Sequence, residues 1–241
     1  LKEVLGPVTG QRGAAMALLD GWDAAMLEDR PEPLIYATWM RALQTELAAD
    51  ELGDLVGAFT HPNPIFLERV LTDTDGAAVW CDNRLTPDPE TCAQAVATAL
   101  DRALERLAQS PGGALADLRW GAVHQATHDH PVLGGLPVIG RFVNIRQSTS
   151  GGDNTLLRGL TYGTGDAPLR NKHGALYRGV VDMAAPESSV FVISTGQSGH
   201  PLSPHYRDLA VLWRDGRYVS MALDPEVVRA DAKAVTRLLP E

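Results

Sequence analysis

The feature of this sequence that most constrains its fold is a change of pattern at Pro111–Gly112–Gly113. Before this point, apolar residues recur at intervals of three and four, as they do on one face of a helix. After it, short apolar runs alternate with Gly, Pro, Asp and Ser clusters, which is typical of strands joined by turns. The pattern predicts an α+β chain, with a helical segment at 1–112 and an antiparallel β-rich segment at 113–241.

The helical segment contains one strong pattern and three others. The strong pattern follows TPDPE, where we expect Asp88 to be the N-cap and Pro89 the first helical residue of a helix that stops at the Pro-Gly-Gly sequence. The other helical patterns are AAMALLDGWDAAMLEDR, PLIYATWMRALQTELAADELG and NPIFLERVL. Together they predict a helical core for the first segment.

Five strands are expected in the second segment, and they are RFVNIRQ, TLLRGLTYG, ALYRGVVDM, SVFVISTG and RYVSMAL. Residues 190–193 contain no polar side chain, so we expect that strand to be covered on both faces. We expect these strands to form a β-rich part of the chain that ends in short helices.

Charge and composition exclude some classes of function. The net charge is -9 and no cluster of Lys or Arg stands out, so a nucleic-acid partner is not expected. About 18 consecutive apolar residues are needed to span a membrane, and no such run occurs. The chain starts with Leu1, without an initiator methionine or a signal-peptide pattern, and we expect it to be a processed or excised piece of a longer protein.

The stretch WGAVHQATHDHP gathers His124, His128 and His130. On a helix the first two would share a face, as in HExxH zinc enzymes, but glutamine replaces the glutamate, and glycine and proline interrupt the segment. We therefore expect a loop. Two interpretations stay open: the three histidines bind zinc in a hydrolase, or they form hydrogen bonds that fix the loop.

Two further motifs have a catalytic and a structural interpretation. GQSGH partly matches the G-x-S-x-G nucleophile elbow, but His200 replaces the last glycine and prolines follow, so a structural turn is favoured over a Ser198 nucleophile. Asp182 shares a predicted strand face with Arg178. It is expected to form an ion pair there, or to orient a catalytic group supplied from elsewhere.

The two cysteines, Cys81 and Cys92, flank a proline-rich loop. They are too few for a structural zinc site made of thiolates alone. A disulfide and two free thiols are equally compatible with the composition.

Taken in order, five motifs resemble the C-terminal part of the β subunit of the penicillin acylase family. They are WCDNRLTPDPETC, LRWGAVHQATHDHP, GGDNTLLRG, HGALYRGVVDM and FVISTGQSGHPLSPHYRDLAVLWRDGRYVSM. The family includes penicillin acylases, cephalosporin acylases and N-acyl homoserine lactone acylases. The resemblance extends from about Leu18 onward, and GQSGHPLSPHYRD is its most specific part.

The resemblance implies an N-terminal-nucleophile hydrolase with a four-layer αββα sandwich. In such enzymes the precursor cuts itself into α and β chains, and the new first residue of β, normally Ser, attacks the amide of a small N-acyl substrate. Residue 1 here is Leu, and in the family the nucleophile and oxyanion donors lie upstream of the matching stretch. The chain is therefore expected to be inert alone, and to need the α subunit and the N-terminal catalytic part of β as partners.

The resemblance also implies roles for individual residues. No catalytic residue is expected in this chain, apart from a supporting role for Asp182 behind the site. The structural hydrogen-bonding residues are expected to be His124, His128, His130, His200 and His205. No cofactor and no metal are expected in this chain, although a structural calcium is possible elsewhere in the full enzyme.

Export is common in this branch of the family. It implies a periplasmic or secreted protein, and it favours a Cys81–Cys92 disulfide. Two alternatives to the enzyme fragment are kept: a non-enzymatic scaffold or binding module of the same fold, and a zinc hydrolase at His124, His128 and His130.

Overall fold

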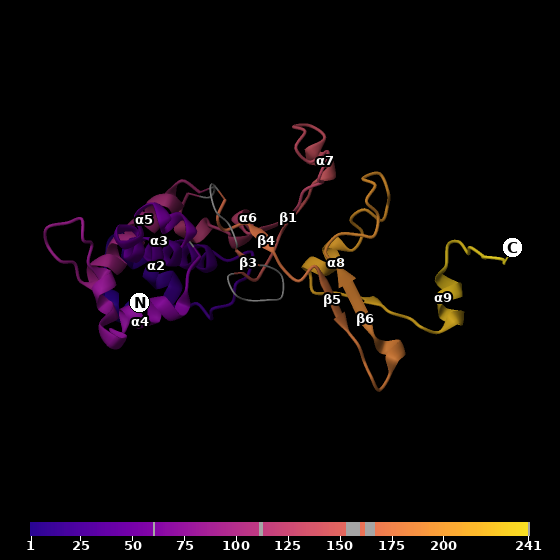
Figure 1. The fold of residues 1–241 in the computed structure, drawn as a ribbon, viewed down its shortest axis with the longest axis horizontal. Helices are drawn as coiled ribbons and strands as arrows, with labels where there is room; N and C mark the ends of the chain where they lie inside the picture. The colour runs from indigo at the N-terminus through magenta and orange to yellow at the C-terminus, as the bar shows by residue number, and fades with distance from the viewer. Residues whose placement is uncertain (60, 111–112, 153–159, 162–166, 241) are drawn as a thin grey trace. The chain divides into compact units, whose positions relative to one another are not determined.

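A computed structural model describes residues 1–59, 61–110, 113–152, 160–161 and 167–240 (Figure 1). As expected, helices make up much of the first part of the chain, and among the described residues strands appear only in the later part. The helical prediction for AAMALLDGWDAAMLEDR is wrong after Asp20, because the helix ends there with Gly21 as its C-cap and residues 21–30 are not helical. The helices are α1 (Lys2–Leu5), α2 (Gly10–Asp20), α3 (Glu32–Leu52), α4 (Pro64–Leu71), α5 (Cys92–Ala108), α6 (Trp120–Val123), α7 (Gly140–Val143), α8 (Ala210–Arg214) and α9 (Pro225–Asp231), with 3-10 turns η1 (Gly53–Ala58), η2 (Thr74–Cys81), η3 (Leu115–Asp117) and η4 (Pro186–Ser188).

The chain divides into two compact units. The helical unit consists of residues 1–127 and 146–174, and the sheet unit consists of residues 128–145 and 175–241. The division predicted from the sequence is of another kind: it separates a helical segment, 1–112, from a β-rich segment, 113–241, within one domain that is shared with other chains. It stays a prediction.

The core of the helical unit forms where α3 packs against α5. Ile35, Leu43 and Leu47 of α3 recur at helical spacing and are completely buried, as are Val96 and Leu100 of α5. Each such side chain contributes roughly 1.5–3 kcal/mol when it leaves water. The two apolar stripes recognised in the sequence therefore face each other.

The start of α5 differs from the prediction. The N-cap is Thr91, not Asp88: its hydroxyl accepts from the Gln94 backbone N–H, and the Gln94 side chain accepts from the Thr91 N–H. This reciprocal capping box satisfies two N–H groups that a helix start leaves without partners. The T-x-x-Q spacing is the signal that indicates this start.

A disulfide joins Cys81 to Cys92, with 4.8 Å between their Cα atoms. It closes the loop of residues 82–91, which hydrogen bonds also brace: Glu90 donates its N–H to the Asp82 carboxylate at 3.1 Å, and its own carboxylate accepts from the Asn83 N–H at 2.9 Å. The disulfide prediction is confirmed.

The four-stranded sheet falls largely within the helical unit and has the order β2-β1-β4-β3. Its strands are β1 (Gln125–His128), β2 (Ile145–Ser148), β3 (Leu160–Thr161) and β4 (Asn171–His173). β1 runs parallel to β4, and β3 runs antiparallel to it, so the expected purely antiparallel arrangement is wrong for this sheet.

Two sequence predictions change in this region, and a third motif lies mostly outside the described residues. Gln125–His128 is not a loop but forms β1, which pairs with β4. RFVNIRQ is not one strand: α7 takes its start and β2 its end. Of TLLRGLTYG only Leu160–Thr161 is described, as β3, and the rest of that motif and of GGDNTLLRG from residue 153 lies outside the described residues.

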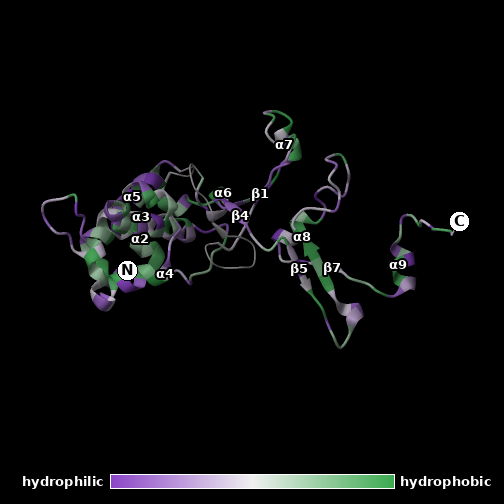
Figure 2. Cartoon of the chain, in the orientation of Figure 1, coloured by the Kyte–Doolittle hydropathy of each residue, from purple (hydrophilic) through white to green (hydrophobic). Residues whose placement is uncertain are grey.

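The sheet unit contains the antiparallel sheet β5-β6-β7, formed by β5 (Tyr177–Val180), β6 (Val190–Ile193) and β7 (Val219–Ser220). α8 packs on one face, where Trp213 and Val192 are buried and the Arg178 guanidinium lies 5.4 Å from the Trp213 ring centre. Hydrophobic residues of this sheet are green in Figure 2, and β6 consists of them alone.

The other face of this sheet carries Tyr177, Phe191, Ile193 and Val219, each of which is at least partly exposed among the described residues. Tyr177 stacks on Phe191 there, with 6.3 Å between the ring centres. The expectation that residues 190–193 are covered on both faces is therefore wrong for this chain alone, since only Val192 of the strand is buried.

We expect the double substitution Cys81→Ala and Cys92→Ala to lower the free energy of unfolding of the intact protein by about 3 kcal/mol, because the disulfide limits the freedom of the unfolded chain. Urea denaturation followed by circular dichroism measures the change. A reducing agent should lower the stability of the wild type by a similar amount and leave the double variant unchanged. Equal sensitivity of both proteins to the reducing agent would contradict this expectation.

Candidate functional site

His124 is a completely buried junction of the helical unit. Its ring stacks on Trp120, with 4.4 Å between the ring centres, and its Nδ1 lies 2.9 Å from the Leu169 carbonyl oxygen. A carbonyl only accepts hydrogen bonds, so Nδ1 carries the proton. The His124 carbonyl in turn accepts from both the N–H and the hydroxyl of Thr149, at 3.1 and 3.0 Å.

Burial lowers the pKa of His124 to about 4, and the bond to the Leu169 carbonyl offsets only part of that effect. The imidazole is therefore neutral at physiological pH. Its Nε2 is buried and has no hydrogen-bond partner among the described residues. Because one ring nitrogen binds a carbonyl and the ring is closed off by Trp120, His124 acts as a packed structural group.

His128 and His130 belong to the sheet unit and hold different contacts. The His128 ring meets Trp213 edge to face at 6.0 Å, and burial lowers its pKa. The His130 Nδ1 accepts from the backbone N–H groups of Val132 and Leu133, at 3.2 and 3.1 Å. That ring shapes the turn that follows it.

The GQSGH motif forms a turn tied to the segment that follows. Ser198 donates its N–H to the His205 carbonyl at 3.0 Å, and its hydroxyl oxygen accepts from the His200 N–H at 3.1 Å. The His205 Nδ1 lies 2.8 Å from a carboxylate oxygen of Asp208. A Cβ at Gly196 would lie 2.2 Å from the His205 carbonyl oxygen, so only glycine allows this approach.

Two of the sequence motifs meet in the sheet unit, which the sequence alone does not indicate. A pocket of about 390 Å³ is lined on one side by His128, Asp129 and His130, and on the other by Thr195 and residues 196–199. Tyr206 also lines it and donates its hydroxyl to the Val143 carbonyl at 2.6 Å. His124, Asp182, His200 and His205 are not among the residues that line this pocket.

Asp182 serves a turn at the end of β5. Its carboxylate accepts from the N–H groups of Ala184 and Ala185, at 2.9 and 3.0 Å, and its own N–H donates to the Ser189 hydroxyl. Arg178 instead points to the Trp213 carbonyl and the rings around it. These contacts account for Asp182 as a turn residue, and its role in orienting a catalytic group stays a prediction.

The three histidines of WGAVHQATHDHP do not form a ligand set. Among the residues that the structure describes, no three His, Cys, Asp or Glu side chains gather closely enough to hold a metal ion. Nδ1 of His124 and Nδ1 of His130 are also engaged by backbone groups. The zinc-hydrolase alternative therefore has no support in the geometry.

None of the described helices has the length and apolar character needed to cross a bilayer.

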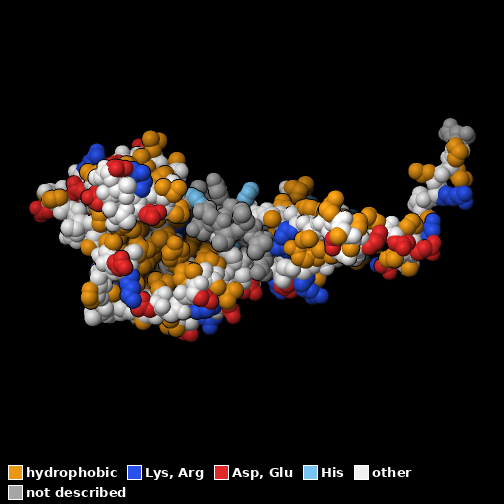
Figure 3. Space-filling model, turned by 90° about the horizontal axis from the view of Figure 1, so that it is seen from below, with side chains coloured by type: hydrophobic (Ala, Val, Ile, Leu, Met, Phe, Trp, Pro, Cys, Tyr) orange, Lys and Arg blue, Asp and Glu red, His pale blue; other side chains and the backbone are white. Residues whose placement is uncertain are grey.

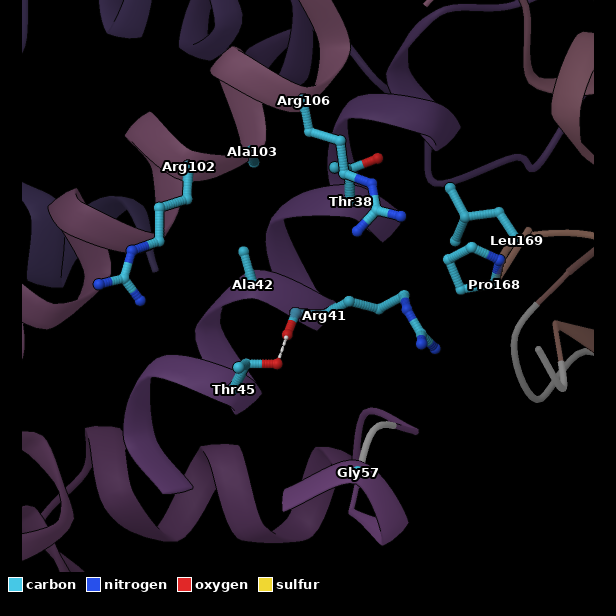
Figure 4. Close-up of a pocket in the computed structure, with 10 residues that line it drawn as sticks. All are labelled: Thr38, Arg41, Ala42, Thr45, Gly57, Arg102, Ala103, Arg106, Pro168 and Leu169. Carbon is cyan, nitrogen blue, oxygen red and sulfur yellow. Dashed lines mark hydrogen bonds between the residues drawn. The ribbon is translucent and has the colours of Figure 1, made fainter. Parts of the chain in front are cut away.

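A groove between α3 and α5 is a further hollow of the helical unit, and the sequence did not predict it. It measures about 570 Å³ and is lined by Thr38, Arg41, Ala42, Thr45, Gly57, Arg102, Ala103, Arg106, Pro168 and Leu169. We call it the arginine groove. Arg41 and Arg106 extend toward the same space near Pro168 and Leu169, whereas Arg102 points away (Figure 4). The i, i+4 spacing of Arg102 and Arg106 is the sequence signal for one charged helix face.

Glu51 at the end of α3 has a strongly shifted pKa. Burial raises it to about 7, and the neighbouring carboxyl of Asp50 adds to the rise. Arg84 approaches to 3.3 Å. Glu51 does not line the arginine groove or the sheet-unit pocket, so it belongs to the support of the disulfide loop.

Comparison with known proteins gives consistent results. A family model described as penicillin amidase matches residues 1–230. Acyl-homoserine lactone acylase QuiP of Pseudomonas aeruginosa is 29% identical over 237 residues, which cover 90% of this chain and 28% of the relative. Penicillin acylase 2 proenzyme of a Pseudomonas species is 28% identical over 224 residues, with 92% of this chain and 28% of the relative covered.

The fold is similar to that of a thermostable penicillin G acylase from Alcaligenes faecalis, with a TM-score of 0.55 at 17% identity. That similarity covers 98% of this chain and 44% of the solved chain. The chain spans just over a quarter of the length of the two curated relatives, at 28% of each.

We expect His124 to make the protein sensitive to acid. Protonation is disfavoured in the folded state, whose pKa for this group is about 4 against an ordinary 6.5, so stability is complete above pH 6.5 and falls as the pH drops toward 4. His124→Gln should abolish on the order of 2–3 kcal/mol of the loss between pH 7.5 and 4.5. Urea unfolding followed by tryptophan fluorescence at the two pH values measures it.

The control is His200→Gln, which alters an exposed ring. This variant should keep the acid sensitivity of the wild type. An acid-induced loss that is the same in His124→Gln and in the wild type would rule out His124 as its source.

Proposed function

The chain belongs to the penicillin amidase family, and on that premise we propose that it is the non-nucleophile portion of an amidohydrolase that cleaves the amide bond of N-acyl compounds. The observation that carries the proposal is the match of the family model to residues 1–230 of 241. The names of the relatives, an acyl-homoserine lactone acylase and a penicillin acylase, support it. The proposed substrates are N-acyl homoserine lactones and β-lactams such as penicillin.

In the proposed reaction, an N-terminal serine exposed by self-cleavage of the precursor is supplied by another segment. Its hydroxyl oxygen bonds to the amide carbon while its own α-amino group takes the proton, and N–H donors hold the resulting oxyanion. The C–N bond then breaks, the proton passes to the leaving amine, and water hydrolyses the ester to release the acid. The partners are therefore the α subunit and the N-terminal catalytic part of the β subunit.

The contacts of Ser198 support placing the nucleophile elsewhere. Its hydroxyl oxygen accepts from the His200 N–H within a turn, and its N–H is bound to the His205 carbonyl. A serine nucleophile needs a base within hydrogen-bond reach, and the described contacts of this hydroxyl include none. Ser198 is assigned to the structure of the turn.

We propose that the sheet β5-β6-β7 of this unit is one of the two β layers of a four-layer αββα sandwich. Its sheet is covered by α8 on one face, whereas Tyr177, Phe191 and Ile193 stay partly exposed on the other. A sheet buries its apolar face against another layer, and a second sheet packs at about 10 Å in such arrangements. A sheet formed by the remaining polypeptide is the proposed cover.

The helical unit also leaves apolar surface for other chain segments. Hydrophobic side chains surround a hollow on one face of this unit (Figure 3). Leu55, Ile65 and Val79 are 69%, 70% and 58% exposed. Contiguous apolar surface usually marks a site of protein contact, which supports a heteromer.

The proposed location is the periplasm or the outside of the cell. The Cys81–Cys92 disulfide supports it, because structural disulfides persist in oxidising compartments.

The decisive experiment uses the complete precursor after processing. We expect it to release amine from N-acyl homoserine lactones or penicillins, and we expect replacement of the first β-chain residue by Ala to reduce the rate at least about a thousandfold, because that group supplies both nucleophile and base. Amine release measured with a fluorogenic reagent follows the reaction.

Ser198→Ala is the matched control, since it removes a hydroxyl that serves a turn. It should keep the hydrolysis rate within a few fold of the wild type. Full activity after loss of the first β-chain residue would refute the mechanism, and a processed protein without hydrolysis of any N-acyl compound would favour the scaffold.

A further inference from the structure

The arginine groove has no acidic residue among its described lining residues. The ionisable residues that are described there are Arg41, Arg102 and Arg106. The whole chain has the opposite balance, with 30 acidic and 21 basic side chains. A hollow of one sign in a chain of the other sign favours a ligand of complementary charge.

Several polar groups in the groove are already occupied. The Thr38 hydroxyl donates to the Leu34 carbonyl at 2.7 Å, and the Thr45 hydroxyl donates to the Arg41 carbonyl at 3.0 Å, the bond drawn in Figure 4. Arg102 pairs with Glu46. For Arg106, which is exposed, no described residue supplies a carboxylate. Its guanidinium is therefore available to a ligand.

The hollow continues past Arg106. A second cavity of about 310 Å³ shares Thr38, Arg106, Pro168 and Leu169 with the arginine groove and adds Arg170. Its described lining residues also include no Asp or Glu. Arg106 thus lines both hollows, together with the apolar residues Pro168 and Leu169.

We propose that the arginine groove docks a segment of the remaining precursor polypeptide that places an Asp or Glu carboxylate against Arg106. The inference rests on the proposed function for the existence of that polypeptide. A relative named as a proenzyme is matched over only 28% of its length, so most of such a precursor lies outside this chain. Guanidinium binds carboxylate through two parallel N–H···O bonds, which fixes orientation as well as affinity.

Site-specific photocrosslinking in the complete processed protein tests the inference. Thr45→p-benzoylphenylalanine places the probe at a residue that lines the groove, and it leaves Arg106 and the Arg102–Glu46 pair intact. After irradiation, mass spectrometry should identify a crosslinked peptide from outside this chain that contains Asp or Glu. Crosslinks confined to this chain or to a second copy of it, and crosslinks to a peptide without an acidic residue, would each overturn the proposal.

Charge variants add an independent measurement. Arg106→Glu in the probe-bearing protein should lower the yield of that crosslink about tenfold, and Arg106→Lys should retain most of it. Arg237→Glu, the same charge change at an exposed position outside the groove, should have no effect. An unchanged yield in Arg106→Glu would also overturn the proposal.

Hydrolysis is assayed on the same samples, so that the two proposals fail separately. The expected crosslink without amide hydrolysis would remove the proposed function and keep the docking site. Hydrolysis without that crosslink would remove the docking site and keep the function.

Discussion

The helical unit depends on the buried junction at His124. Trp120 covers one face of the ring, the Leu169 carbonyl fixes its proton on Nδ1, and Thr149 binds the His124 carbonyl twice. Asn171 extends the network by donating to the Thr149 hydroxyl at 3.1 Å. Segments distant in the chain are thereby joined where β1, β2 and β4 begin or end. Because the imidazole is held neutral by burial, the same junction that stabilises the fold at neutral pH weakens it in acid.

Many polar groups of the two units form hydrogen bonds within their own unit, whereas other surfaces stay exposed. Backbone groups engage Nδ1 of the buried or turn-forming histidines, and the GQSGH turn satisfies its own hydroxyl. In contrast, one face of the sheet β5-β6-β7 leaves apolar side chains partly exposed, and the charged residues described in the lining of the arginine groove are all arginines. Exposed apolar faces and clusters of like charge are unfavourable on a surface that stays in contact with water. They are expected where further polypeptide packs. This pattern agrees with a chain that spans about a quarter of its relatives.

The conspicuous motifs have contacts in the structure that differ from the roles their sequence patterns suggest. The histidine cluster suggested a metal site by spacing alone, yet one ring packs inside the helical unit while the other two line a pocket of the sheet unit. GQSGH suggested a nucleophile, yet Gly196 is there because the His205 carbonyl leaves no room for a side chain. The less conspicuous arginines of α3 and α5 prove to be the charged groups that surround the larger hollow. Residue type alone did not distinguish packing from binding.

The sequence by itself determined the helices α3 and α5, the disulfide candidates and the family, since each depends on a local or ordered pattern: apolar spacing predicts the two helices, and five motifs in order indicate the relatives. It did not determine where α5 begins, because TPDPETCAQ contains two candidate N-caps, Asp88 and Thr91. The structure, in which the Cys81–Cys92 disulfide closes this loop, shows that Thr91 is the N-cap. Only tertiary structure made Gln125–His128 a strand, because pairing with β4 outweighs the weak propensity of that stretch. Only tertiary structure, too, brought residues 128–130 beside residues 196–199, since contact between segments so far apart depends on the packing of the whole unit.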